Sequence, residues 1–177
     1  VDRSPTAEEK LAILYATGSS GSGAFVAIGS GHTASVEALG EVLIEVRRAQ
    51  QLTDVQFEDI ALARGPNGLS AVALAAQRGQ AQAIRAWTRI VLTGWQAGWV
   101  SSGKVKAMLT APEGPVLFGA LLNGQDDVVD ALGEFLFEAR EVGMLTNEEF
   151  FDALAASRPG DGLSALEAGL MNGHAPA

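Results

Sequence analysis

Few residues in this chain of 177 have the types and spacing that chemistry requires. The segment Gly98-Trp-Val-Ser-Ser-Gly-Lys104 has the spacing of a phosphate-binding P-loop. Val105 takes the place of the Ser or Thr that would hold magnesium, and no strand pattern precedes the segment. We therefore expect Ser101 or Ser102 to cap a helix here. The glycine and serine run at residues 18–23 lacks the lysine of a P-loop and is expected to form a loop.

Metal ligands and nucleophiles are equally scarce. His32 and His174 are the only histidines, both follow a glycine, and there is no cysteine. A zinc site needs three or four such ligands, so we expect both histidines to stabilise turns. No serine or lysine has a base at motif spacing. The acidic pairs begin predicted helices, where negative charge offsets the helix dipole; they are Glu8-Glu9, Asp126-Asp127 and Glu148-Glu149. The sequence thus predicts no catalytic residue, no metal and no cofactor.

The elements that would position any site recur along the chain. Four segments share an opening glycine, a short apolar stretch and a closing glycine; they are residues 21–31, 68–79, 114–124 and 162–173. The closing glycines Gly31, Gly79, Gly124 and Gly173 are 48, 45 and 49 residues apart. A period of this size is typical of stacked repeat proteins.

Each repeat is expected to contain three helices. The glycine-closed stretch predicts a short helix, and apolar residues at helical spacing predict a long one after it. These apolar residues are Val36, Leu39, Val42, Leu43 and Val46 in the first repeat, Ile84, Trp87, Ile90 and Val91 in the second, and Val129, Leu132, Phe135, Leu136 and Ala139 in the third. A third helix starts at a capping box such as Thr53 with Gln56 or Thr146 with Glu149. A link rich in Pro and Gly, such as residues 64–68, ends the repeat.

No stretch alternates apolar and polar residues as a half-buried strand would, so we expect an all-α protein, an α-solenoid of stacked repeats of about 45–49 residues. Residues 1–20 would be the last helix of a partial repeat, starting at a capping box of Thr6 and Glu9. Residues 21–67, 68–113 and 114–161 would be repeats, and residues 162–177 the start of another. This organisation indicates a fragment of a larger protein.

The helix pairs resemble ankyrin repeats. Residues 68–79 and 162–174 are similar to the first helix and turn of that family, with Ser70 and Ser164 in the place of its threonine, and Gly31-His32 and Gly173-His174 keep its turn. The Thr-Pro-Leu-His tetrapeptide of the family is absent, and the period exceeds the usual 33 or so residues. We assign the extra residues to the third helix, in place of the family's β-hairpin loop. The resemblance implies a protein-binding module.

Composition limits the partners and the compartment. A formal net charge of −9 disfavours nucleic acids and anionic membranes. No apolar run is long enough to span a bilayer, and the absence of cysteine favours an intracellular setting. The alanine-rich, acidic repeats also resemble ankyrin-like segments of type III effectors that pathogenic bacteria secrete. That resemblance implies the bacterial cytoplasm and then the host cytosol as locations, a role in virulence, and a host protein as the partner.

The second repeat has an unusual surface. No acidic residue lies between Asp59 and Glu113, whereas six bases do, so this stretch carries +6 and the rest of the chain −15. Trp87 is expected in the core because Leu39 and Leu132 take its offset. Trp and Arg are common in binding hot spots, so the candidate partner surface consists of Trp95, Trp99, Arg78, Arg85 and Arg89. The alternative for Trp95 is that it packs against the third helix of its own repeat.

Two other functions stay open from the sequence. The chain could be part of an enzyme whose catalytic residues lie outside it. It could also be a structural unit that self-associates through the open ends of the repeats. Neither alternative has a motif of its own, so protein recognition is the function that the sequence favours.

Overall fold

The protein is all-α over the residues that the structure describes. It is a computed structural model that describes residues 21–111 and 116–155 together with Thr6, Glu9, Ala12, Thr17, Gly18, Gly162 and Glu167. Nine helices occupy this part of the chain. The strands within it are one antiparallel pair, β1 (Thr17–Gly18) and β2 (Gly21–Ser22). The glycine and serine run therefore contributes to a strand pair rather than forming only a loop, and Ser22 also caps the first helix by accepting a hydrogen bond from the Phe25 amide.

The helices follow one another as three trios with the same order of lengths. Unit 1 contains α2 (Gly23–Gly29), α3 (Thr33–Arg48) and α4 (Asp54–Ala61). Unit 2 contains α5 (Ala71–Gln77), α6 (Ala81–Gln96) and α7 (Ser102–Leu109). Unit 3 contains α8 (Val116–Leu122), α9 (Asp126–Glu141) and α10 (Asn147–Leu154). The short, long and third helices lie within the repeats at residues 21–67, 68–113 and 114–161.

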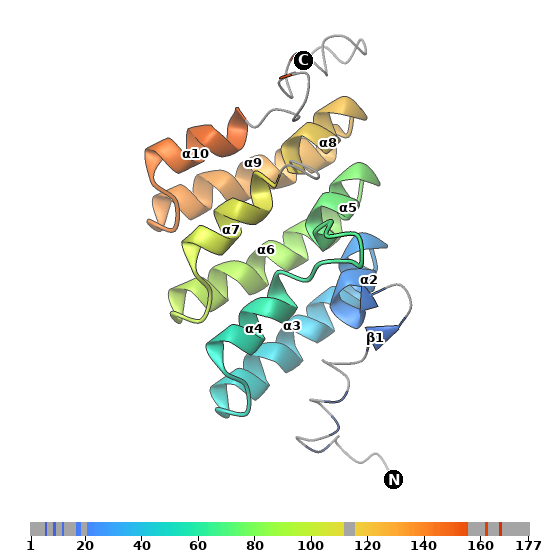
Figure 1. The fold of residues 1–177 in the computed structure, drawn as a ribbon, viewed down its shortest axis with the longest axis vertical. Coiled ribbons are helices and arrows are strands. Elements are labelled where there is room, and N and C mark those ends of the chain that lie inside the picture. Colours follow the sequence, from blue (N-terminus) through green and yellow to red (C-terminus); the bar gives the residue numbers. More distant parts are fainter. Residues whose placement is uncertain are drawn as a thin grey trace.

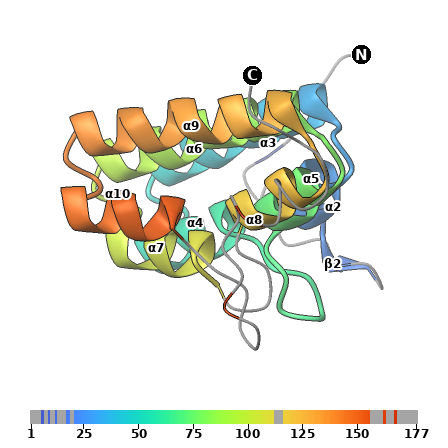
Figure 2. The same cartoon turned by 90° about the horizontal axis from the view of Figure 1, so that it is seen from above.

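Equivalent helices of neighbouring units pack against each other. The long helices α3, α6 and α9 lie side by side in one layer, and the short helices α2, α5 and α8 contact each other in the same order in a second layer (Figures 1 and 2). The third helices α4, α7 and α10 share this second layer, beside the short ones (Figure 2). Each unit thus lays an apolar face against the next one.

The closing glycines form equivalent turns before the long helices. Gly31, Gly79 and Gly124 have φ angles of 75°, 74° and 61°, a conformation that residues with a Cβ rarely adopt. A Cβ on Gly31 would also collide with the Gln80 side chain of the next unit, and one on Gly79 with Gln125. All three glycines therefore serve the turn, and Gly31 and Gly79 also lie close to a side chain of the next unit.

Local hydrogen bonds start the third helices where the sequence predicts. Thr53 with Gln56 and Thr146 with Glu149 form complete capping boxes. Ser101, rather than Ser102, caps α7 by accepting from the Lys104 amide. Thr6 and Glu9 exchange two such bonds, of 2.6 and 3.3 Å. Because helices of eight residues are marginal alone, they also depend on packing.

The core runs continuously through the units. The predicted residues of the long helices are buried or packed against it, and Trp87 lies at its centre. The Trp87 indole donates a hydrogen bond of 2.7 Å to the Ala61 carbonyl of unit 1. Its ring meets the edge of Phe135 of unit 3, with centroids 5.5 Å apart. The predicted core role of Trp87 is confirmed, and this side chain ties three units together.

The link between α4 and α5 corrects one expectation. Arg64 and Ser70 form an antiparallel bridge, and the Gly65 amide donates to the Leu69 carbonyl over 2.9 Å. Gly68 completes the turn with a φ of 82°. This hairpin projects from the helical layers (Figure 2). The third helix therefore adds to a hairpin link in unit 1 and does not replace it.

The histidine expectation also changes. His32 stands at the N-cap of α3, but its exposed side chain makes no capping hydrogen bond. Backbone bonds hold the turn instead, among them one of 3.0 Å from the His32 amide to Ala27. The expected stabilisation of this turn by the His32 side chain therefore does not take the form of a capping hydrogen bond. The helix predicted within residues 1–20, the repeat start at 162–177 and His174 lie outside the described residues, apart from the few named above.

Candidate functional site

The two tryptophans of the predicted partner surface lie against the core. Trp95 and Trp99 are both partly buried and pack on the central cluster. The Trp99 ring meets the edge of Phe57 of unit 1, with centroids 5.3 Å apart. The Arg47 guanidinium covers another side of it, at 5.2 Å from the ring centroid. Trp99 therefore joins units 1 and 2, and only part of its ring remains open to a partner.

The three predicted arginines make contacts between units. Arg78 donates a 3.0 Å hydrogen bond to the Gly29 carbonyl of unit 1. Arg85 and Arg89, one turn apart on α6, point to opposite neighbours. Arg85 pairs with Glu134 of unit 3 at 3.0 Å, and this hydrogen bond raises the pKa of the guanidinium. Arg89 pairs with Glu37 of unit 1 at 3.5 Å and leaves 73% of its side chain exposed.

These five residues do not form one cluster. Arg78 precedes α6, the other two arginines lie within its first nine residues, and Trp95 and Trp99 lie at and beyond its end. A helix of 16 residues is about 24 Å long, so the set spans the whole unit. Of the five, Arg89 is the one whose side chain is mostly exposed on the long-helix face.

The positive charge of unit 2 has partners inside the chain. Four of its five bases pair with acids of the flanking units; the pairs are Arg85 with Glu134, Arg89 with Glu37, Lys104 with Glu58 and Asp59, and Lys106 with Asp152. A basic unit thus lies between two acidic units. Much of the charge that the sequence places on a partner surface is therefore paired within the chain, across the boundaries between units.

Glu58 is the most enclosed of these charges. It is buried at the C-terminal half of α4 and accepts hydrogen bonds of 2.7 Å from both the amide and the hydroxyl of Ser101. The Lys104 ammonium lies 2.6 Å away. Burial by itself would raise the pKa of Glu58, but the bonds from Lys104 and Ser101 outweigh it and lower the pKa. The sequence offered no signal for this site, because its members are 43 or more residues apart.

The contacts of Glu58 also involve the P-loop-like segment, residues 98–104. The Ser101 amide, which a phosphate would need, is bonded to Glu58. The hydrogen bond with Glu58 raises the pKa of Lys104, which favours the protonated form of its amine. The capping interpretation of the segment is confirmed.

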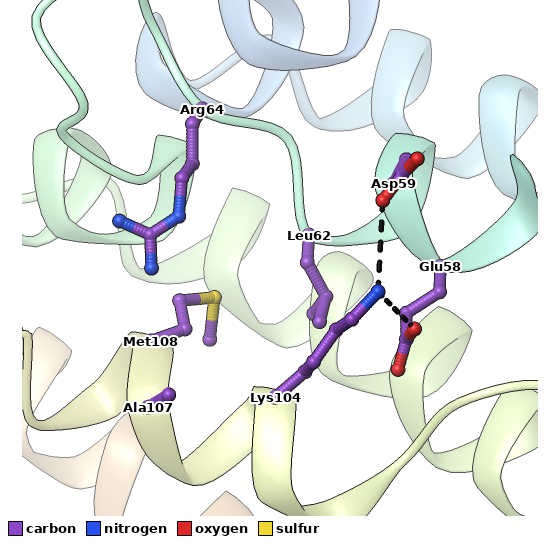
Figure 3. A pocket seen from close by; sticks show the side chains of 7 residues that line it. All are labelled: Glu58, Asp59, Leu62, Arg64, Lys104, Ala107 and Met108. Atoms are coloured by element: carbon purple, nitrogen blue, oxygen red, sulfur yellow. Dashed lines mark ion pairs between the residues drawn. The ribbon is translucent and has the colours of Figure 1, made fainter. Parts of the chain in front are cut away.

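A cleft of about 420 Å³ adjoins this ion pair (Figure 3). Its lining residues come from α4, the link after it and α7; they are Glu58, Asp59, Leu62, Arg64, Lys104, Ala107 and Met108. In Figure 3 the Lys104 ammonium lies between the two carboxylates, and Arg64 extends from the opposite wall towards Met108. The two carboxylates of the cleft and its ammonium are engaged with one another, with Lys104 2.6 Å from Glu58 and 3.8 Å from Asp59.

A second groove runs along the long-helix layer between α3 and α6. One hollow of about 410 Å³ is lined by Glu37, Gly40, Glu41, Ile44, Ala86, Arg89, Ile90 and Thr93. An adjoining one of about 450 Å³ shares Glu41, Ile44 and Thr93 with it and adds Glu45 and Arg48. Acidic side chains thus follow the α3 wall, with Ile44 between them and Arg89 opposite. Of the five predicted residues, Arg89 contributes to this groove.

Exposed aromatic rings lie at the far end of unit 3. Phe137 of α9 and Phe151 of α10 are exposed, and both contact the buried ring of Phe150. The Arg140 guanidinium covers Phe137 and Phe150 at 5.2 and 4.7 Å. Sequence reasoning missed this surface, although one signal existed. Phe151 takes the offset at which the other repeats carry charged residues.

Two classes of site find no support in the described part of the chain. No group of three or more His, Asp or Glu residues there could hold a metal ion. Among the helices described, none combines the length and the apolar character that a membrane crossing requires.

Comparisons with known proteins add no further constraint. Searches against protein-family models, curated proteins and solved structures gave no match.

Proposed function

We propose that this chain is an α-solenoid of ankyrin-like three-helix units that recognises another protein. The proposal is supported by the packing of equivalent helices across units and by the glycine turns at equivalent corners. Stacked units of this kind are rigid, because each one buries its apolar face on its neighbour. A rigid scaffold with helix faces and projecting links suits protein recognition, and the sequence resemblance agrees with it.

The groove between α3 and α6 is the observation that carries the proposal. It offers an apolar floor at Ile44 and Ile90, carboxylates on one wall at Glu41 and Glu45, and the exposed guanidinium of Arg89 on the other. The complementary partner is a peptide segment or helix that places an aliphatic side chain between basic ones. Charged rims of this kind steer association and set specificity. The resemblance to effector segments makes a host protein the first partner to test.

A binding experiment tests this function. The intact protein, immobilised, is exposed to eukaryotic lysate, and captured proteins are compared between the native chain and two variants. In the first, Ile44→Asp with Glu41→Lys changes the groove; in the second, Arg78→Ala with Trp95→Ala changes residues of the surface expected from sequence that do not line the groove. Capture of a defined protein by the native chain and its loss in the groove variant are expected.

The matched control is Val55→Asp, an exposed apolar position on α4 outside the groove. It should capture the same protein as the native chain, and thermal unfolding should confirm that each variant is folded. Equal capture by the groove variant and the control would contradict the proposal. Self-association lost with Trp95→Ala, without a change in melting temperature, would favour a structural unit instead.

A further inference from the structure

The outer face of unit 3 differs in exposure from the same face of the other units. Thirty residues after the closing glycine, Ala61 and Leu109 are 3% and 4% exposed, whereas Leu154 is 38% exposed. Thirteen residues after that glycine, Leu92 is 6% exposed and Ile44 is partly buried, whereas Phe137 is 53% exposed. In units 1 and 2 this face meets the following unit. In unit 3 this face carries large apolar side chains on both α9 and α10. The described residues cover them less than they cover the equivalent side chains of units 1 and 2.

A glycine on the same face marks a close approach. Gly40 and Gly133 both lie nine residues after a closing glycine. A Cβ on Gly40 would lie 2.6 Å from Cγ1 of Ile90, so this glycine admits the long helix of unit 2. A Cβ on Gly133 would meet nothing within 4 Å. Unit 3 therefore has a glycine where unit 1 has the one that α6 packs against, but no described residue packs against the glycine of unit 3.

The charges on this face follow the same register. The residue six positions after one closing glycine pairs with the residue ten positions after the next, as Glu37 with Arg89 and Arg85 with Glu134. At the sixth position of unit 3 stands Asp130, which is exposed. Unit 3 thus presents an acid, a glycine and a large apolar residue in the order of unit 1, where Glu37, Gly40 and Ile44 receive unit 2.

We propose that the exposed face of α9 and α10, formed by Asp130, Gly133, Phe137, Phe151 and Leu154, docks a further three-helix unit of the unit 2 type. Its long helix presents a cationic residue followed directly by a β-branched aliphatic residue, as Arg89 and Ile90 do. The proposal rests on the solenoid arrangement proposed above and specifies the chemistry of the unit that this face would bind. Burial of exposed apolar area drives the contact, and the charge register selects the unit.

A second copy of this chain fits the face poorly. The first residues that its unit 1 would present are Glu41 and Val42, at the tenth and eleventh positions. Glu41 would face Asp130, and juxtaposed like charges oppose association. The segment at 162–174 matches in sequence a short helix and its turn, whereas the long helices of the described units pack chiefly on one another, as α3 does with α6 and α6 with α9.

An extended chain tests the docking directly. A second copy of residues 68–177 is joined after Asp161, so that its Gly68 takes the place of Gly162 and unit 2 follows unit 3. The chain has no cysteine, so Leu154→Cys in the first copy gives a single thiol. A maleimide should label this thiol about tenfold or more slowly in the extended chain than in the native-length chain, because labelling then requires local opening.

Variants of the extended chain examine the register. In the first copy, Gly133→Ala should restore fast labelling because its Cβ would crowd Ile90 of the added copy. Gly103→Ala in the first copy changes a helical glycine with open space around it and should leave labelling slow. Asp130→Arg in the first copy should speed labelling, and Arg89→Glu in the added copy should reverse that effect. Val55→Cys should be labelled fast in both chain lengths. Equal labelling of Leu154→Cys in both lengths would overturn the proposal.

Sedimentation of the native-length chain tests whether a second copy of the chain occupies this face instead. We expect a monomer, and a dimer that disappears with Leu154→Asp would overturn the proposal by making a second copy the occupant. These readouts do not involve a captured protein. Slow labelling together with failed capture would thus support the docking face and contradict the recognition groove. Fast labelling together with successful capture would support the groove and contradict the docking face.

Discussion

At the scale of single residues, Glu58 shows how a charge becomes structural. Its carboxylate is buried where units 1 and 2 meet, yet two bonds from Ser101 and the contact with Lys104 satisfy it. Breaking such an arrangement leaves a polar group buried without its partner, which costs more than the bond itself contributes. Glu58 therefore specifies how α7 sits on α4.

The lowered pKa of Glu58 predicts a dependence of stability on pH. Its folded pKa lies below the unfolded value of about 4.3, so the carboxylate stabilises the fold above that value, and this contribution is lost as pH falls through the folded pKa. We expect Glu58→Gln to lower the free energy of unfolding by about 1–3 kcal/mol at pH 7 and by less at about pH 3. Urea unfolding at both pH values measures this. Parallel pH profiles of variant and native chain would contradict the assignment.

At the scale of elements, we expect glycine to have opposite effects on stability in two equivalent helices, α3 and α9. Gly40 of α3 and Gly133 of α9 occupy matching positions, and alanine favours an isolated helix over glycine by about 1 kcal/mol. Only Gly40 has a neighbouring helix against it. The packing between long helices, rather than helix propensity, therefore explains glycine at Gly40.

Substituting both glycines separates the two effects. Gly133→Ala should raise the free energy of unfolding by up to about 1 kcal/mol through helix propensity. Gly40→Ala should lower it by about 1–3 kcal/mol because its Cβ crowds Ile90. Chemical denaturation of the two variants beside the native chain measures the difference. Changes of the same sign would mean that α6 does not pack so closely on α3.

At the scale of the whole molecule, alternating charge and shared apolar faces hold the units in order. Unit 2 supplies cations to carboxylates on both sides, and Trp87 contacts both neighbours. Exposed ion pairs contribute little individually, so apolar burial supplies most of the stability and the charges select the order. We therefore expect the stability of the chain to grow with the number of contacts between units, so that the loss of one such contact lowers it strongly.

Removal of unit 3 tests this dependence. A chain without residues 115–177 would expose the faces of α5, α6 and α7 that now meet α8, α9 and α10. At about 25 cal/mol per Å² of apolar surface, this loss exceeds the few kcal/mol by which such domains are stable. We expect the shortened chain to be largely unfolded or aggregated, as judged by circular dichroism during heating. A sharp transition at the native temperature would show that units 1 and 2 suffice.

The sequence by itself determined the elements of this protein. The capping boxes at Thr53 and Thr146, the glycine turns and the apolar offsets of the long helices depend on residues only a few positions apart, so they are legible along the chain. Arg89, one residue of the candidate groove, was also predicted, from its charge and type. Its carboxylate wall and its floor at Ile44 were not.

Only the tertiary structure decided what those elements do for one another. The partners of Arg85, Arg89 and Ser101 are 43 to 52 residues away, which no local pattern reveals. Whether Trp99 faces a partner or Phe57, and whether Phe151 is covered, depends on which unit lies alongside. Local hydrogen bonds and helical periodicity act within a unit, whereas surface charge and aromatic rings acquire their roles only when the units are stacked.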